Sequence, residues 1–379
     1  MYIPNANSEE VISAITKMKI GQGDVVAILL GEKNRPDVNL LISGLNKKGV
    51  QFFGGIFPGI ICGTNKYEEG AILMTLPALG KPFLIRGLNT EEIQFPVFEN
   101  KIKETPDKKY TVMILVDGLT SNISLFLSEM FNRLGNSVHY FGGGAGSMTL
   151  KQEPCLFTSE GFVQDGAIVT FIKLESILGV RHGWERLMGP IVATKTRKNI
   201  IMELNWKNAF LVYRETVEGD SKEELGAKNF FDIAKGYPFG IHKEGMEDIV
   251  RDPIAVNEKG ELICVGEVPE NTVLSILKGK EASLIHAAGQ AADDCLHLME
   301  GTVNMNLIAD CISRVIFLGK HFTKELETVN QKVRSLDDRQ ALMGMLTLGE
   351  ISSYGEEFLE FFNKTIVVGI LYERERRFQ

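Results

Sequence analysis

Two similar segments, Val50-Gln-Phe-Phe-Gly-Gly55 and Val138-His-Tyr-Phe-Gly-Gly143, decide the fold of this chain of 379 residues. They begin 88 positions apart, and each has the pattern of a buried strand that ends at paired glycines. A second pair, Glu69-Gly-Ala-Ile-Leu-Met-Thr75 and Asp165-Gly-Ala-Ile-Val-Thr-Phe171, follows at a spacing of 96. Segments repeated in the same order predict two equivalent units that pack as pseudo-symmetric halves.

Each unit also begins with a strand and a helix. In the first unit the β-branched run Val25–Leu30 predicts the strand, and the apolar spacing within Asp37–Lys48 predicts the helix. Val112–Asp117 and Ser124–Leu134 take these places in the second unit. A weaker third copy is expected near the C-terminus, with a strand, a helix and two strands at Val303–Asp310, His321–Val333, Leu346–Glu350 and Thr365–Leu371.

The order of these elements indicates the fold class. Strands joined both by helices and by short turns argue against a purely parallel sheet. We therefore expect an α+β fold: layered mixed or antiparallel sheets covered by helices and built from duplicated strand-helix-strand-strand units. The stretch between the second and third copies differs in character, with short strands expected at Asn199–Leu204 and Ala209–Tyr213 and a long amphipathic helix at Leu284–Met299.

The composition is that of an ordinary soluble globular protein. Hydrophobic residues make up 44% and charged residues 24% of the chain, which excludes a disordered or collagen-like protein. The 41 basic and 49 acidic residues give a formal net charge of −8, so nucleic acid is not an expected partner. The apolar runs are far shorter than the roughly 20 residues of a membrane helix, so no membrane insertion is expected. Residues 1–17 do not resemble a signal peptide.

The cysteines and histidines indicate a reducing compartment and no structural metal. There are five cysteines, an odd number, and no CxxC pair, which favours free thiols and a cytoplasmic location. The six histidines form no HExxH motif and no paired Cys/His spacing, so no metal site is expected. No GxSxG motif occurs either, and we assign no catalytic residue from these patterns.

The richest glycine cluster, Gly142–Ser147, follows the strand of the second unit. Glycines after a strand allow backbone N–H groups to approach an anion closely. The cluster lacks the GxGxxG and Walker spacings, so a tight turn or the lip of a small-ligand site is favoured over nucleotide binding. We expect ligand contacts from Gly143, Gly144, Ala145, Gly146 and Ser147.

Cys311 and Arg314 follow the strand of the third copy. An arginine at a strand end can bind a carboxylate with two hydrogen bonds, and Glu350, which ends the next strand, could bind an ammonium group. Arg314 and Glu350 would suit a free amino acid, although they could equally pair with each other. A thiol beside a guanidinium predicts a lowered pKa and a nucleophile, but a small buried residue is the simpler interpretation. Asp117 and Asp310 end equivalent strands, where turn capping is favoured over acid–base catalysis.

A turn-rich link contains His182-Gly-Trp184, which places a histidine beside one of only two tryptophans. A lone histidine is more often a hydrogen-bonded structural residue than a ligand-binding one. We nevertheless expect ligand contacts from His182 and Trp184, because the pair lies in a turn.

Taken in order, these motifs resemble the FIST sensory domain in its N-terminal and C-terminal parts, over about residues 20–372. The N-terminal resemblance rests on the Val25 strand, Gly142-Gly-Gly-Ala-Gly-Ser147, Gly166-Ala-Ile-Val169, Gly179-Val-Arg-His-Gly-Trp184, Gly189, Thr194 and Asn199-Ile-Ile-Met-Glu-Leu204. The C-terminal resemblance rests on Tyr237-Pro-Phe-Gly-Ile241, Arg251-Asp-Pro253, the hairpin Val256–Pro269, Asp310-Cys-Ile-Ser-Arg314, Phe317-Leu-Gly319, Gly349-Glu-Ile351 and Asn363-Lys-Thr-Ile-Val-Val368.

The resemblance implies a FIST N-terminal domain over residues 1–205, with its internal repeat at 20–77 and 110–174, and a FIST C-terminal domain over 206–379. It implies a sensory module of prokaryotic signal transduction that binds a small ligand, with amino acids the suggested class. The signal would pass to a separate kinase, cyclase or chemoreceptor-type partner. The family brings no agreed catalytic set, so no catalytic residue is carried over.

Three hypotheses follow for the function. The first is a non-enzymatic bacterial sensor, located in the cytoplasm, that binds an amino acid or similar polar metabolite in a cleft between the two halves. Arg314 would hold the carboxylate, Glu350 the ammonium, and residues 143–147 would donate from the backbone. The second is a haem-binding nitric-oxide sensor with His182 or His286 as axial ligand, a property of some relatives. The third is an enzyme that uses Cys311 as its nucleophile.

Overall fold

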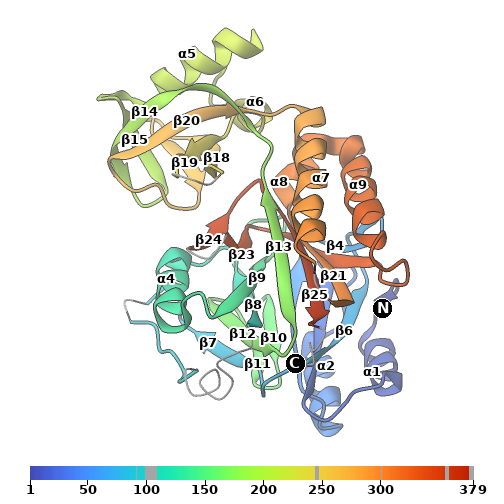
Figure 1. The fold of residues 1–379 in the computed structure, drawn as a ribbon. Coiled ribbons are helices and arrows are strands. Elements are labelled where there is room, and N and C mark those ends of the chain that lie inside the picture. The colour runs from blue at the N-terminus through green and yellow to red at the C-terminus, as the bar shows by residue number, and fades with distance from the viewer. Residues whose placement is uncertain (91, 99–108, 244–246, 300, 355–357, 375–379) are drawn as a thin grey trace.

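Three strand-and-helix units and one antiparallel barrel make up the protein, as a computed structural model shows (Figure 1). The structure describes residues 1–90, 92–98, 109–243, 247–299, 301–354 and 358–374. The three units pack together as the core of the molecule, and the barrel extends from one end of it (Figure 1). No helix among these residues has the length and apolar character needed to cross a bilayer.

Unit I covers the first 77 residues, and its central strand β2 runs parallel to β3 and antiparallel to β6. The helix α2 begins where the Asp37 side chain caps the backbone N–H groups of Asn39 and Leu40. Its buried face, which includes Leu41 and Leu45, packs on the sheet. The elements of unit I are β1 (Tyr2–Ile3), α1 (Ser8–Lys17), β2 (Asp24–Gly31), α2 (Val38–Lys47), β3 (Phe52–Phe57), β4 (Gly59–Cys62), β5 (Asn65–Tyr67) and β6 (Ala71–Pro77).

Unit II repeats this order, with β8 parallel to β9 and antiparallel to β12. The elements of unit II are β7 (Phe83–Arg86), β8 (Tyr110–Asp117), α4 (Ile123–Leu134), β9 (Val138–Ala145), β10 (Leu156–Thr158), β11 (Gly161–Val163) and β12 (Gly166–Ile172).

Unit III repeats it a third time, with β21 parallel to β22 and antiparallel to β25. The elements of unit III are β13 (Glu175–Arg181), α7 (Glu281–His297), β21 (Thr302–Cys311), α8 (Ile312–Leu318), the 3₁₀ turn η1 (Gly319–His321), α9 (Phe322–Arg334), β22 (Leu342–Thr347), β23 (Glu350–Tyr354), β24 (Phe358–Phe362) and β25 (Ile366–Glu373). The weak third copy in the sequence is therefore a full structural unit.

The three units exchange hairpins in a cycle. The β10–β11 hairpin of unit II pairs with β3 of unit I, β23–β24 of unit III pairs with β9 of unit II, and β4–β5 of unit I pairs with β22 of unit III. The repeated glycines lie at these crossings: Leu156 is opposite Gly55, and Glu350 is opposite Gly143. A Cβ atom on Gly143 would lie 2.5 Å from Cγ2 of Thr347, so the close contact between units requires glycine there.

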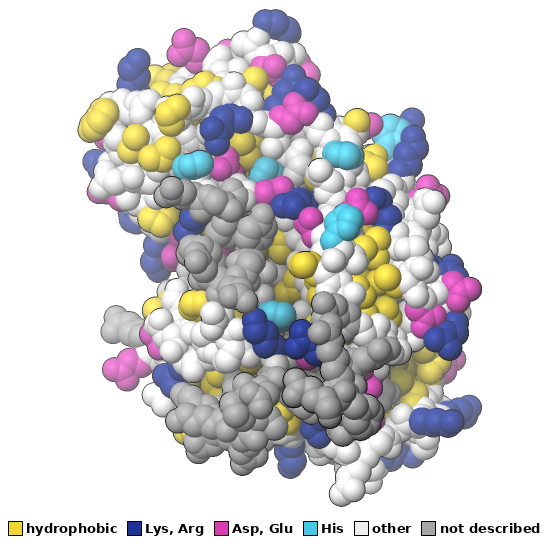
Figure 2. All heavy atoms as spheres, viewed as in Figure 1, with side chains coloured by type: hydrophobic (Ala, Val, Ile, Leu, Met, Phe, Trp, Pro, Cys, Tyr) yellow, Lys and Arg dark blue, Asp and Glu magenta, His cyan; other side chains and the backbone are white. Residues whose placement is uncertain are grey.

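The barrel is inserted into unit III, between β13 and α7. Its strands close in the order β14, β20, β17, β18, β19, β15, because β15 pairs back with β14. The elements of the barrel are β14 (Glu185–Arg197), β15 (Ile200–Leu204), β16 (Lys207–Asn208), α5 (Ala209–Ser221), α6 (Phe230–Ala234), β17 (Phe239–Ile241), β18 (Ile249–Val256), β19 (Leu262–Val265) and β20 (Thr272–Lys278). Figure 2 shows apolar side chains exposed over the barrel.

The observed architecture confirms the predicted α+β class of mixed and antiparallel sheets covered by helices. The strand predicted at Ala209–Tyr213 is wrong, because these residues begin α5, capped by the Asn208 side chain. The division between residues 205 and 206 stays a prediction. Strands from both sides of it share three of the four sheets that the described residues form.

Candidate functional site

A cavity of about 600 Å³ lies between the barrel and the core. Its volume is within the range of pockets that bind small molecules. Units II and III contribute the segment 118–124 before and at the start of α4, the residues 311–313 at the start of α8, and Phe361 and Asn363. The barrel contributes Asp252 and Ile254 from β18, and Cys264 and Val265 from β19. The lining is mostly apolar, so the few polar groups in it determine how a ligand would be oriented.

Asp252 is the most unusual of these polar groups. Its side chain is 1% exposed, and its Oδ2 atom accepts a hydrogen bond from Ser313 Oγ at 3.1 Å and pairs with Lys364 Nζ at 3.1 Å. Within the described part of the chain, its Oδ1 atom has no hydrogen-bond donor. Burial raises the pKa of this carboxyl, and Lys364 acts in the opposite direction. A buried carboxylate oxygen without a donor is costly, so a ligand that donates to it would be stabilised.

The start of α4 forms another polar part of the cavity. Ile123 and Ser124, the first residues of this 12-residue helix, line it. The residue before them, Asn122, makes no side-chain capping hydrogen bond, and its amide nitrogen donates to the carbonyl groups of Leu88 and Thr90. The N-terminus of a helix carries a partial positive charge and favours an anionic group. The wall of the cavity therefore includes an aspartate with a carboxylate oxygen that has no donor among the described residues, and a helix end that favours an acceptor.

The predicted glycine cluster lies beside this cavity, inside the sheets. Gly143, Gly144 and Ala145 belong to β9, which is paired on both sides. The N–H group of Gly144 donates to Gly349 O at 2.7 Å, and that of Gly146 donates to Ile56 O at 2.8 Å. Ser147 bonds to Thr149 in an exposed turn. The N–H groups of Gly144 and Gly146 are therefore used between the units, and contact of this cluster with a ligand stays a prediction.

Arg314 is also placed differently from the expected ligand contact. It is fully buried, and its Nε and Nη2 atoms donate to the carboxylate of Glu325. The remaining donors bond to the carbonyl oxygens of His182, Lys364 and Leu284, at 2.5, 3.2 and 3.0 Å. All the guanidinium donors are therefore used inside the protein, and none is left for a ligand carboxylate.

Glu350 and Cys311 lie next to this arginine cluster. Glu350 is buried, accepts a hydrogen bond from Thr347 Oγ1 at 2.5 Å and another from the Thr365 backbone at 3.3 Å, and does not line the cavity. Burial raises its pKa to about 8. Cys311 does line the cavity, but burial and the neighbouring Glu350 raise the pKa of its thiol. The expected activation by Arg314 is thus outweighed, and the thiol stays protonated at neutral pH.

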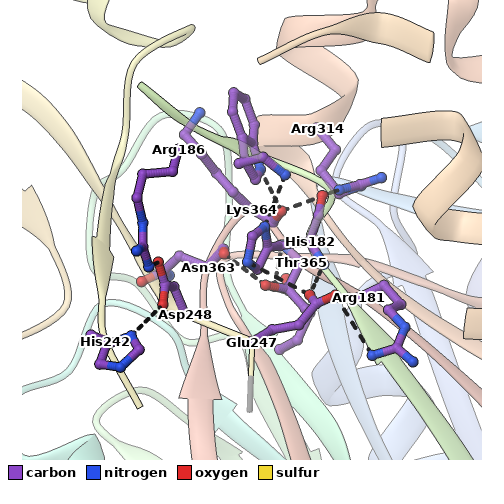
Figure 3. Close-up of polar contacts among 12 residues, drawn as sticks. Arg181, His182, Arg186, His242, Glu247, Asp248, Arg314, Asn363, Lys364 and Thr365 are labelled. Carbon is purple, nitrogen blue, oxygen red and sulfur yellow. Dashed lines mark hydrogen bonds and ion pairs between the residues drawn. The ribbon is translucent and has the colours of Figure 1, made fainter. Parts of the chain in front are cut away.

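His182 and Trp184 lie at the junction of core and barrel and line a shallow depression together with residues of α7. His182 Nδ1 accepts a hydrogen bond from the Trp184 backbone, and its Nε2 atom is 3.6 Å from Glu247, which also faces Arg181 (Figure 3). Burial lowers the pKa of His182. The Nδ1 atom is thus engaged inside the protein, and the Nε2 atom faces a carboxylate.

The other histidine suggested for haem, His286, is exposed on α7. No histidine is among the described residues that line the large cavity. These residues do not fit an axial haem ligand. Haem binding stays a prediction, and a Soret band in protein purified from haem-supplemented cultures would test it.

Comparison with protein families decides the assignment. A family model described as the FIST N domain matches residues 22–207, and one described as the FIST C domain matches residues 209–353. The chain belongs to the FIST family. FIST domains are sensory domains of signal transduction, and the family is not one of enzymes. A comparison with curated proteins returns no similar chain.

Of the ten residues expected to contact ligand, the structure places Cys311 alone in the described lining of the cavity. Asp252 and Lys364 were not among them, although both stand inside motifs of the FIST resemblance. One signal in the sequence points to Asp252: Arg251-Asp-Pro253 interrupts an otherwise apolar strand, Ile249–Val256. Charged residues inside such a strand are rare unless they are paired or functional.

Proposed function

We propose that this FIST protein is a cytoplasmic bacterial sensor that binds an amino acid or a similar small zwitterionic metabolite in the cavity between barrel and core. Binding would be reported to a separate signalling protein of the kinase, cyclase or chemoreceptor type. The observation that carries the proposal is the buried Oδ1 atom of Asp252, which has no donor among the described residues and belongs to a side chain in the wall of a mostly apolar cavity.

Asp252 and the start of α4, two of the polar parts of the cavity, suit the two charged groups of an amino acid. The ammonium group would donate to Asp252, and the carboxylate would lie at the start of α4, where Ile123 and Ser124 line the wall. The apolar lining, which includes Ile254, Phe361 and Ile316, would accept an apolar side chain. A side chain such as that of leucine therefore fits better than a charged one.

The position of the cavity links binding to a change of shape. Its walls belong to two bodies, the barrel and the core, which are joined through the link after β13 and through the connection from β20 to α7. A ligand that contacts both walls binds the closed arrangement more tightly than an open one, and so shifts the population toward closure.

Thermal unfolding with leucine and two analogues tests this proposal. L-leucine should raise the midpoint temperature in a saturable way, because a ligand that binds only the folded state stabilises it by about 2.7 kcal/mol at 100 times its Kd. Isosteres that lack one charge, 4-methylpentanoate and 3-methylbutylamine, should bind more weakly. Screening the other amino acids in the same assay would define the side-chain preference.

Matched variants assign the effect to the cavity. Asp252→Asn should abolish the stabilisation by leucine, whereas Asp248→Asn should preserve it, because Asp248 bonds to Arg186 and His242 outside the cavity. A flat response to every amino acid, or equal binding by Asp252→Asn, would overturn the proposal.

A further inference from the structure

Lys364 connects the wall of the cavity to the buried junction of core and barrel. Its side chain is fully buried, and Nζ lies 3.1 Å from Asp252 Oδ2 and 2.9 Å from the carbonyl oxygen of Lys235. The same Nζ lies 4.7 Å from the ring centroid of Trp184, over its face. One ammonium group thus joins the carboxylate that faces the cavity to an indole that lies outside it.

The backbone of Lys364, like its side chain, is hydrogen-bonded to surrounding residues. Its carbonyl oxygen accepts hydrogen bonds from Trp184 Nε1 at 3.0 Å and from Arg314 Nη1 at 3.2 Å (Figure 3). Its φ of 53° lies in the left-handed region, which is unfavourable for a residue with a long side chain. Lys364 stands in the turn between β24 and β25, which belong to two different sheets of the core. A displacement of this residue would therefore reach both sheets.

We propose that Lys364 is the positioning residue of the sensor: it holds Asp252 toward the cavity and transmits ligand binding to Trp184 and the β24–β25 turn. The inference rests on the proposed function, because it needs a cationic group to bind at Asp252. Two cations then share one buried carboxylate, and the pair of Asp252 and Lys364 weakens as the ligand pairs with Oδ1. The coupling is reciprocal, so any change that displaces Lys364 also changes the affinity for the ligand.

The two tryptophans of the chain make this coupling measurable. Trp206 is 79% exposed at the tip of the β15–β16 hairpin, so Trp206→Phe removes its signal without touching the core. In this background the emission of Trp184 reports on the charge over its ring. Asp252→Asn, without any ligand, should shift the emission maximum of Trp184, because Lys364 loses its carboxylate partner. Asp248→Asn should leave it unchanged.

Lys364→Met gives the reference for complete loss of the ammonium group, and its emission shift should have the opposite sign to that of Asp252→Asn, because one variant removes the positive charge and the other its negative partner. If this variant does not fold, the double variant Asp252→Asn/Lys364→Met removes both charges and serves instead. Far-UV circular dichroism should match the parent in every variant compared. An Asp252→Asn emission identical to the Asp248→Asn control would overturn the inference.

Adding L-leucine separates this inference from the proposed function. A rise in midpoint temperature together with a shift of Trp184 emission supports both. A rise without any shift in emission keeps the proposed function and overturns the role of Lys364. If no amino acid stabilises the protein but Asp252→Asn still shifts the emission, the proposed function fails and the link from Asp252 to Trp184 stands.

Discussion

Arg314 and Asp252 are both buried charged groups next to the same junction, yet their surroundings differ in one respect. Every donor of Arg314 is bonded to Glu325 or to a backbone carbonyl group. Asp252 has two donors on Oδ2 and none on Oδ1 among the described residues. The arginine had the more suggestive sequence context, but the aspartate retains the capacity to bind something else.

The difference follows from the cost of burying charge. A buried ion loses the favourable hydration of water, and only a complete set of hydrogen bonds compensates for that loss. A complete set, as at Arg314, makes the surrounding structure rigid and leaves no role for a ligand. An incomplete set of hydrogen bonds, as at Asp252, lowers the stability of the ligand-free protein. It also increases the binding free energy of a ligand that supplies the missing donor. Unfilled bonding capacity therefore distinguishes the candidate binding site from the structural cluster.

The largest expected effect is that of removing Arg314. Arg314→Met leaves the buried carboxylates of Glu325 and Asp310 without their cation and removes one donor from each of three carbonyl groups. We expect a loss of about 3–5 kcal/mol in the free energy of unfolding, measured by urea denaturation. Arg314→Lys keeps the charge and should lose less. A cost below about 1 kcal/mol for Arg314→Met would show that the cluster is not structural.

The pair of Asp252 and Lys364 should show a smaller net effect and a clear coupling. Lys364→Met leaves a buried carboxylate without its cation, whereas the double variant Asp252→Asn/Lys364→Met removes both charges. The double variant should therefore cost less than the sum of the single variants, by about 0.5–3 kcal/mol. A double-mutant cycle measured by urea denaturation gives this coupling. Additive costs would mean that the two side chains do not interact.

Glu350 should give the arginine cluster a dependence on pH. Its pKa in the folded protein is raised to about 8 by burial, so between the ordinary value of 4.5 and about 8 the folded state binds a proton that the unfolded state has lost. The contribution to stability is complete below pH 4.5 and is lost as the pH rises through about 8, at up to about 1.4 kcal/mol per pH unit.

The window from pH 6.5 to 8 isolates this effect. The pKa of His182 is lowered by burial from its ordinary value of 6.5, so His182 is neutral in the folded state there and is partly protonated in the unfolded state only near the lower end of the window. Asp310, whose pKa burial raises, contributes in the same direction as Glu350. Denaturation midpoints measured across this window should fall less steeply with pH in Glu350→Gln than in the unaltered protein. Equal dependence of the midpoint on pH in the two proteins would show that protonation of Glu350 does not cause the loss of stability.

The sequence was sufficient to predict much of the fold because strand periodicity and paired glycines are local signals. Val138–Gly143 and Val303–Asp310 form strands as expected, and the α+β class is confirmed. The hairpin exchange was not foreseeable, since it depends on contacts between residues far apart in the chain, such as Glu350 opposite Gly143. The helix at Ala209–Ser221 was missed because its early residues, Phe210, Leu211 and Val212, have strand-like propensity, and capping by Asn208 with tertiary packing overrides it.

The candidate site was harder to predict, because residue type does not reveal whether a polar group is already bonded. Arg314 and Glu350 have the chemistry to bind an amino acid, but Arg314 is hydrogen-bonded to Glu325, and Glu350 accepts a hydrogen bond from Thr347. Asp252 becomes distinctive only when the barrel is placed against the core. A binding capacity that arises between two bodies of a protein cannot be read from either segment alone.

Cys311 gives the last and smallest test, since it lies where the two regions meet: it lines the cavity and adjoins the arginine cluster. Its thiol is 2% exposed and its pKa is raised by burial, so both access and thiolate fraction are low. Cys62 is half-buried and should react first with iodoacetamide at neutral pH, although burial raises its pKa as well. In Cys62→Ser the native protein should incorporate label far more slowly than the urea-unfolded protein. Mass spectrometry of the labelled peptides distinguishes the two cysteines. Rapid labelling of Cys311 in the native state would place a reactive nucleophile in the cavity and restore the hypothesis of a cysteine-dependent enzyme.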